Sequence, residues 1–265
     1  MNPSYQITVE IGGMPILLHT QDDSFRQLLA RRYAGFVDSA TPPRFEFDIE
    51  LTTPSAPAPD DEVRVEMRDG TWRLRRGDFR AQWNPGVGRG RIRQSANPYS
   101  IDSVLRIVHT LILAQEGGFL LHSAGAIRNR RAFLFSGVSG AGKTTISRLA
   151  PPDVILLTDE VSYIRRVGAG YRACGTPFAG ELARVGENCS AAIASLFFLK
   201  QGPENKIEAM AKSEGIRCLM RNILFFSADA NLVQNVFQSA CEFVERVPVQ
   251  RLTFTPDSRV WDLIR

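Results

Sequence analysis

One stretch of eight residues constrains the fold of this chain more than any other. Gly137-Val-Ser-Gly-Ala-Gly142-Lys143-Thr144 fits the pattern G-x-x-x-x-G-K-[ST] at every position. The stretch follows the apolar run AFLFS, which is typical of a buried strand, and precedes a helical pattern that begins at Thr144. The motif therefore predicts a strand, a glycine-rich turn and a helix in this order.

The residue types in this stretch point to phosphate binding. Glycines let the backbone wrap a phosphate chain without a Cβ in the way, and their N–H groups point inward to it. Lys143, one of 4 lysines in a chain that has 32 lysines and arginines together, would reach the β- and γ-phosphates. Thr144 would hold Mg²⁺, and the helix N-terminus adds its dipole. The expected ATP-binding residues are Gly137, Ser139, Gly140, Ala141, Gly142, Lys143, Thr144 and Thr145.

Two acids follow the next apolar run, LLTDE. Asp159 and Glu160 come at its end, the usual place for a carboxylate that faces a metal-bound phosphate. Neighbours in a strand point to opposite faces, so the two acids share a site only if the strand ends there. We expect one acid to bind the metal and the other to act as base toward a hydroxyl, and the sequence does not decide which. The alternative is that both are solvated strand-end charges.

Other phosphate-loop proteins carry a second motif. Transporter-type ATPases need L-S-G-G-Q, which this sequence lacks, and GTPases need D-x-x-G and N-K-x-D. Asn205-Lys206-Ile207-Glu208 comes within one carbon of N-K-x-D, but Asp159 to Ser162 does not fit D-x-x-G. We interpret the near match as coincidence, and the glycine motif alone does not specify a reaction.

Composition limits the remaining possibilities. The 265 residues are 44% apolar and 23% charged, with a net charge of +4, as in ordinary soluble globular proteins. The four cysteines form no C-x-x-C and the three histidines no ligand pair, so we expect neither a zinc site nor a disulfide framework. The first residues, MNPSYQITVEIGG, contain no basic segment followed by an apolar one, so we expect no secretory signal, and the longest apolar region is interrupted by polar residues. We expect a cytoplasmic protein without a nucleic-acid or membrane partner.

The chain reads as two regions. Residues 1–97 predict a small α+β domain with short strands, one helix at about 23–36 and a hairpin around Asp69-Gly70. The run 84–98, with two prolines and three glycines, is expected to be a boundary or a mobile loop. Residues 98–265 alternate strand-like runs, including VILLTDEVSYIRR, with helices at about 144–149, 212–219 and 230–241, which indicates an α/β domain.

Three further features are candidates for function. The sequence between positions 73 and 93 contains seven arginines and a single acid, Asp78. This cluster either binds an acidic partner or is a solvated face of a sheet. His122 lies in the apolar run FLLHSAGAI, where a lone histidine is more often a core residue than a catalyst. The segment CGTPFAGELARVGEN is expected to be a lid or substrate grip, in which Arg184 could supply further positive charge. The seven arginines are Arg73, Arg75, Arg76, Arg80, Arg89, Arg91 and Arg93.

LLHSAGAI, GVSGAGKTT, LLTDEVSYI, GTPFAGE and LFFLKQG, in this order and spacing, resemble the HPr kinase/phosphorylase family. The nucleotide domain of that family is similar to that of phosphoenolpyruvate carboxykinase. The resemblance covers about residues 100–225 and implies an α/β P-loop kinase domain that uses ATP and Mg²⁺ to phosphorylate a serine of a protein or peptide. It implies active-site positions for His122, which would sense or polarise the γ-phosphate, and for Lys143, Asp159 and Glu160.

The sequence also departs from that family. Its acidic pair is Asp-Glu where the bifunctional enzymes usually carry Asp-Asp, and it has no counterpart of their Glu-Arg-Gly-Leu-Gly signature, which argues against phosphate-dependent reversal. The first hundred residues look unlike that family's regulatory domain, which argues against HPr itself as the substrate. Relatives of this kind include kinases of precursor peptides of natural products. The rival hypotheses are an ATP-binding regulator that transfers nothing and a kinase of a small-molecule alcohol.

Overall fold

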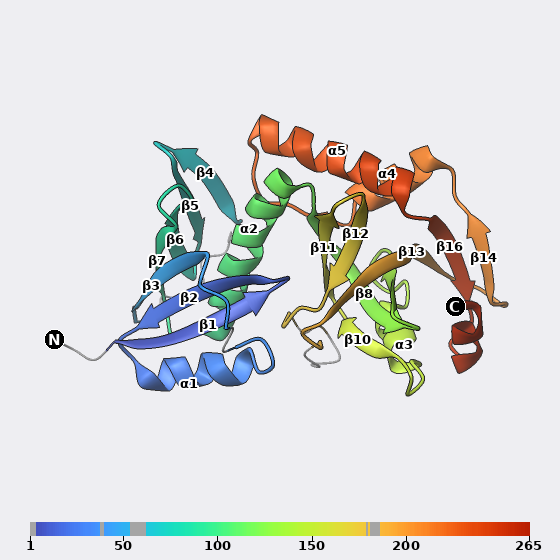
Figure 1. Cartoon of the computed structure of the whole chain (residues 1–265), viewed down its shortest axis with the longest axis horizontal. Helices are drawn as coiled ribbons and strands as arrows, with labels where there is room; N and C mark the ends of the chain where they lie inside the picture. The colour runs from blue at the N-terminus through green and yellow to red at the C-terminus, as the bar shows by residue number, and fades with distance from the viewer. Residues whose placement is uncertain (1–3, 38–39, 54–61, 179, 181–185) are drawn as a thin grey trace. The chain divides into compact units, whose positions relative to one another are not determined.

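Two sheets, each in a unit of its own, form the framework of the molecule (Figure 1). The computed structural model describes residues 4–37, 40–53, 62–178, 180 and 186–265. The first unit takes its residues from Met1–Leu111 and Phe225–Val233, and the second from Ile112–Leu224 and Gln234–Arg265. The domain boundary was expected at 97–98, where the helix α2 (Pro98–Glu116) begins, whereas the two units divide within this helix, after Leu111.

The sheet of the first unit has seven strands in the order β1-β2-β3-β7-β6-β5-β4. The strand β3 runs parallel to both of its neighbours, and the other pairs are antiparallel. The helix α1 contacts β1 and β2. The bounds are β1 (Tyr5–Ile11), β2 (Met14–Thr20), α1 (Asp23–Arg32), β3 (Phe45–Leu51), β4 (Arg64–Arg68), β5 (Thr71–Arg76), β6 (Phe79–Asn84) and β7 (Arg89–Gln94).

The prediction of a boundary or mobile loop at 84–98 was wrong, because β7 lies within it and pairs with β3 and β6. Ile92 is the only large apolar residue of this strand, so its alternating pattern is faint in the sequence. A Cβ at Gly90 would lie 2.4 Å from the Phe47 ring, so this glycine lets the ring lie against the strand. The helix expected at 23–36 ends earlier, at Arg32.

The arginine cluster lies mainly on the exposed face of this sheet. Successive side chains of a strand point to opposite faces of the sheet, so in β5 Trp72 and Leu74 are buried while Arg73 and Arg75 are exposed. In β6 and β7 the arginines likewise lie on the exposed face. Arg76 departs from the cluster, because it is half-buried and its Nε donates to Asp78 Oδ1 at 2.6 Å. That guanidinium holds the pKa of the Asp78 carboxyl below its usual value.

The second unit has a mixed sheet in the order β10-β8-β11-β12-β13-β16-β14. The strand β9 pairs with β8 and β13, and β15 pairs with β8. The bounds are β8 (Phe119–Arg128), β9 (Arg131–Ser136), α3 (Lys143–Arg148), β10 (Ile155–Thr158), β11 (Val161–Val167), β12 (Gly170–Cys174), β13 (Ser190–Gln201), β14 (Lys206–Ala209), α4 (Lys212–Met220), β15 (Ile223–Leu224), α5 (Ala230–Arg246), β16 (Val249–Phe254) and the 3-10 helix η1 (Ser258–Leu263). The expected mixed α/β architecture is confirmed.

Apolar side chains cover the second sheet on both faces. Along β9, Leu134 belongs to one buried cluster, with Phe243 of α5, whereas Phe133 belongs to the other. In that second cluster Trp261 of η1 donates from its Nε1 to the carbonyl of Ile146 in α3, at 3.1 Å. Figure 1 shows α4 and α5 on one side of this sheet and α3 on the other. The apolar run AFLFS is therefore a strand that is buried on both faces, as predicted.

Three parallel strands position the loops that matter for function. The strand β13 runs parallel to β9 on one side and to β16 on the other. Their carboxyl ends therefore lie at one edge of the sheet. Residues 137–142 follow β9, residues 202–205 follow β13, and residues 255–257 follow β16. In open α/β sheets, ligands bind at the carboxyl ends of the strands.

Candidate functional site

A pocket of about 260 Å³ in the second unit gathers most of the predicted site residues. Gly137 and Ala141 belong to the glycine stretch but do not line it. A larger hollow of about 540 Å³, in the first unit, is lined by Arg91 of the arginine cluster and by none of the residues predicted to bind ATP or the metal. The residues that line the smaller pocket are His122, Ser139, Gly140, Gly142, Lys143, Thr144, Thr145, Asp159, Glu160 and Gly180.

The glycine stretch forms the turn between β9 and α3, and contacts with neighbouring segments hold it in place. Gly142 has φ +109°, and a Cβ there would lie 2.5 Å from Cζ of Phe254, so no larger residue fits this position. Gln201, at the end of β13, donates from Nε2 to the carbonyl of Gly140 at 2.8 Å. Within the stretch, Lys143 Nζ donates to the carbonyl of Gly137 at 3.1 Å. These contacts fix a loop whose residues wrap one concave space, as phosphate binding requires.

The two acids lie in a turn and not in a strand. The run VILLTDEVSYIRR, expected to form one strand, is divided into β10 and β11. The buried hydroxyl of Thr158 accepts hydrogen bonds from the N–H groups of Glu160 and Val161, at 3.2 and 3.1 Å, and so stabilises the turn. The strand ends at Thr158, so Asp159 and Glu160 are not forced to opposite faces of the sheet as neighbours in a strand would be. Both of them line the pocket.

Gly180, which follows β12 in the chain, contacts these acids. Gly180 donates its N–H to Oδ1 of the buried Asp159 at 2.8 Å, and a Cβ at Gly180 would lie 2.9 Å from the Cβ of Glu160. Thr176 ties the start of the loop to the sheet, because its N–H donates to the Leu157 carbonyl at 3.1 Å. The predicted lid is thus in contact with the acidic pair at Gly180. Arg184, the arginine expected to assist, lies outside the described residues.

His122 lines the pocket from β8, where it lies opposite Val161 of β11. Its backbone is held on both sides, because its N–H donates to Asn222 and its carbonyl accepts from the Ser136 hydroxyl, each at 2.8 Å. The residue is half-buried. It is therefore not a histidine sealed in the core, the more frequent situation for a lone histidine in an apolar strand.

The oxygen atoms of the pocket suit a magnesium ion. Among the described residues, no group of three or more His, Cys, Asp or Glu side chains is arranged to hold a metal. Mg²⁺ does not need such a group, because it is usually held by one or two carboxylates together with substrate phosphates and water. Thr144, Asp159 and Glu160 supply one hydroxyl and two carboxylates beside the glycine stretch. This donor set fits Mg²⁺ that arrives with a phosphate chain.

Sequence reasoning missed three residues that shape the site. Thr158 gives a recognisable signal, because a hydroxyl residue before two acids within an apolar run is typical of a side-chain-stabilised turn. Gly180 and Gln201 give none, since their contacts with Asp159 and Gly140 join segments that lie far apart in the chain.

The fold and the site define a mixed α/β protein with a glycine-loop pocket that faces two carboxylates. The chain belongs to the family described as SynChlorMet cassette protein ScmC, whose model matches residues 93–265. Among solved structures, it is similar to the Hpr(Ser) kinase/phosphatase from Coxiella burnetii, with 11% identity over 55% of this chain and 90% of that chain. The TM-score of the two structures is 0.29.

No match was found among the curated proteins. In the described part of the chain, no helix has the combined length and apolar character that a membrane span requires.

Proposed function

We propose that this protein is a kinase that transfers the γ-phosphoryl group of ATP to a hydroxyl, with serine of a protein or peptide as the acceptor. One observation carries the proposal: a single pocket is lined by Lys143, Thr144 and other residues of the glycine stretch together with His122, Asp159 and Glu160. Phosphoryl transfer needs charge neutralisation and positioning more than covalent chemistry, and these residues supply both. The resemblance of the sequence motifs to a serine kinase family supports the same reaction.

The proposed mechanism is in-line transfer. The hydroxyl oxygen forms a bond to the γ-phosphorus while the bond from that phosphorus to the β,γ-bridging oxygen breaks, and ADP leaves. Asp159 accepts the hydroxyl proton, and its hydrogen bond from Gly180 fixes the orientation of the carboxylate. Lys143 and the loop N–H groups balance phosphate charge. Mg²⁺, held by Thr144 and Glu160, would neutralise developing charge, and His122 would polarise the γ-phosphate.

We also propose a docking surface for an acidic segment of the substrate. The arginine face consists of Arg64, Arg73, Arg75, Arg80, Arg89, Arg91 and Arg93, all of which are exposed. Acids of β3 pair with two of these residues: Glu46 with Arg89 at 3.0 Å and Glu50 with Arg93 at 3.1 Å.

The centre of the arginine face brings like charges together. Arg75 lies directly opposite Arg80, and Arg80 lies directly opposite Arg93, on neighbouring strands. Like charges in such positions destabilise a sheet. Bound carboxylates would relieve that repulsion, which supports an acidic ligand.

Transfer of label from γ-labelled ATP to components of a lysate or a peptide library tests the kinase proposal. We expect a labelled serine with the wild type and none with Lys143→Ala. By calorimetry, the Mg-ATP affinity of that variant should fall about tenfold or more, because a charge-assisted contact contributes roughly 1.5 to 3 kcal/mol. ATP binding without any labelled product would favour the regulator, and a labelled small alcohol would favour the small-molecule kinase. Unchanged affinity in the variant would contradict the proposal altogether.

A further inference from the structure

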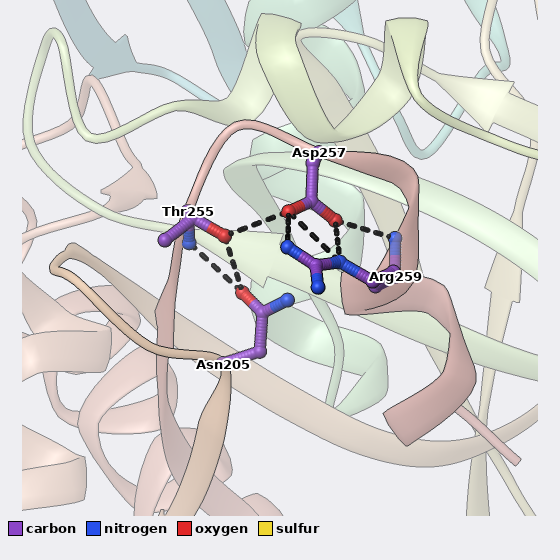
Figure 2. A network of polar contacts seen from close by, with 4 residues as sticks. All are labelled: Asn205, Thr255, Asp257 and Arg259. Atoms are coloured by element: carbon purple, nitrogen blue, oxygen red, sulfur yellow. Dashed lines mark hydrogen bonds and ion pairs between the residues drawn. The ribbon is translucent and has the colours of Figure 1, made fainter.

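A polar network lies at the carboxyl ends of β13 and β16, beside the glycine stretch and outside the pocket described above. It consists of Asn205, Thr255, Asp257 and Arg259 (Figure 2). Two sets of contacts locate it. Phe254, the residue before Thr255, lies against Gly142, and the 3-10 helix η1, which includes Arg259, is anchored to α3 by Trp261.

The loop between β13 and β14 brings Asn205 to Thr255 and the rest of the network. This loop begins at Gln201, which donates to the Gly140 carbonyl at 2.8 Å, and it ends at Asn205. Asn205 Oδ1 accepts from the N–H and the hydroxyl of Thr255, at 2.8 and 3.2 Å. The glycine stretch and the network are therefore neighbours along one edge of the sheet, where the parallel strands β9, β13 and β16 end.

The network holds an arginine side chain in a fixed plane. Arg259 donates from Nη2 to Asp257 Oδ2 at 2.7 Å and from Nε to Oδ1 at 3.1 Å, while its own N–H donates to Oδ1 at 2.8 Å. The Thr255 hydroxyl lies 3.2 Å from Asp257 Oδ2 as well as from Asn205 Oδ1, so its single proton is shared between these two acceptors. Despite these bonds, 79% of the Arg259 side chain is exposed. A planar guanidinium that is both oriented and exposed is well suited to stack on an aromatic ring.

The network also contains an amide donor. Because Asn205 Oδ1 is used by Thr255, the Nδ2 group is turned the other way, toward the side of the Arg259 guanidinium (Figure 2). Nδ2 makes no hydrogen bond to another of the described residues. An amide N–H beside a stacking plane can donate to a ring nitrogen or a carbonyl of a planar heterocycle.

We infer that this network is the subsite for the base of a purine nucleotide, with the base stacked on Arg259 and accepting from Asn205 Nδ2. The inference rests on the proposed function, because it needs the phosphates of the same nucleotide in the glycine stretch. It also gives a different account of Asn205-Lys206-Ile207-Glu208 from that of a GTPase motif. Lys206 pairs with Glu204 and with Glu208, each at 3.4 Å, and within this run it is Asn205 that contacts the network.

Calorimetry of the full chain with two probes tests this inference: Mg-ADP, which has a base, and Mg-tripolyphosphate, which has none. Arg259→Ala should weaken ADP binding about tenfold, the loss expected for one base-stacking contact, and leave tripolyphosphate binding within twofold. Arg259→Lys should resemble the alanine variant, because it keeps the charge but not the plane. Asp257→Asn should give a smaller loss for ADP alone, since it loosens the guanidinium.

A matched control is Lys212→Ala, which removes an exposed cation paired with Glu245 near the amino end of β16. It should change neither affinity. Equal weakening of ADP and tripolyphosphate by Arg259→Ala, or full rescue by lysine, would make Arg259 a phosphate ligand and overturn the base subsite. Unchanged ADP affinity in the alanine variant would overturn it as well. If the wild type binds neither probe, it is the proposed function that fails.

Discussion

Asp159 and Glu160 are adjacent in the chain, yet their surroundings differ. Asp159 is buried and held by Gly180, whereas Glu160 is half-buried. If Asp159 takes the proton of the attacking hydroxyl, Asp159→Asn keeps the size of the side chain but cannot act as a base. We expect single-turnover transfer to fall by about 10² to 10⁴, with ATP affinity nearly intact. Wild-type transfer by this variant would contradict the assignment.

Glu160→Gln should behave differently from Asp159→Asn. A lost metal partner affects both binding and chemistry, so the variant should need more Mg²⁺ for half-maximal rate and should also transfer more slowly. Magnesium titrations of the transfer rate measure this. If the Mg²⁺ requirement changes in Asp159→Asn and not in Glu160→Gln, the roles of the two acids are exchanged.

Gly180 offers a test of the loop that contacts the acids. In Gly180→Ala the new methyl would lie 2.9 Å from the Cβ of Glu160 and 3.1 Å from Asp159 Oδ2, so the loop or the acids must shift. We expect kcat to fall about tenfold, in keeping with the sensitivity of catalysis to small displacements. Gly170→Ala is the control, because a Cβ at Gly170 would meet nothing within 4 Å. Equal kcat values for the two variants would show that the loop contact is not used.

At the scale of elements, the sheet of the first unit presents a charged face whose role can be tested by charge reversal. Changing Arg75 and Arg80 to Glu should weaken binding of a Glu-rich peptide at least tenfold at low salt and leave ATP affinity alone. Fluorescence anisotropy at low and high ionic strength measures this, and wild-type binding should weaken as salt is raised.

Reversal of Arg217 and Arg221 serves as the control for that experiment. Both are exposed arginines at the end of α4 or just after it, in the second unit, so the change in net charge is the same. If both pairs of substitutions have the same effect, the arginine face is only a solvated surface.

The elements also show why some features could be predicted from the sequence and others could not. The glycine stretch and its flanking strand and helix were predictable, because the motif and the apolar run are local signals. The strand β7 was not, since Gly90 and three arginines conceal its alternation. The sequence pattern also could not show that Arg76 differs from the other arginines of the cluster. Its pairing with Asp78 depends on the conformation of the chain at the end of β5. The meeting of Asp159 with Gly180 is a long-range contact, which no local pattern encodes.

At the scale of the whole molecule, His109 makes stability depend on pH. Burial, with a contribution from the charge of Arg44, lowers the pKa of His109 from 6.5 to about 3. Between those values the unfolded chain binds a proton that the folded chain does not, so stability falls as the pH drops below 6.5. At pH 5 the free energy of unfolding should be about 2 kcal/mol lower than at pH 7.

Urea unfolding at pH 7 and pH 5 measures this difference, and His109→Leu should remove most of it. Asp78 does not interfere, because the stability from its lowered pKa is fully present above its ordinary value of 3.8 and is lost only at more acidic pH. An equal loss in the wild type and in His109→Leu would assign the effect to other groups.

The first unit is built from two separate segments of the chain, residues 1–111 and Phe225–Val233, and Ile112–Leu224 of the second unit lies between them. During synthesis, residues 1–111 leave the ribosome long before that last segment exists. The first unit can therefore be completed only after Ile112–Leu224, the larger part of the second unit, has been translated, which departs from the usual order in which the N-terminal domain folds first. A gene cut between codons 111 and 112 would not encode two self-sufficient halves, and a ribosome paused before codon 233 would carry both units unfinished.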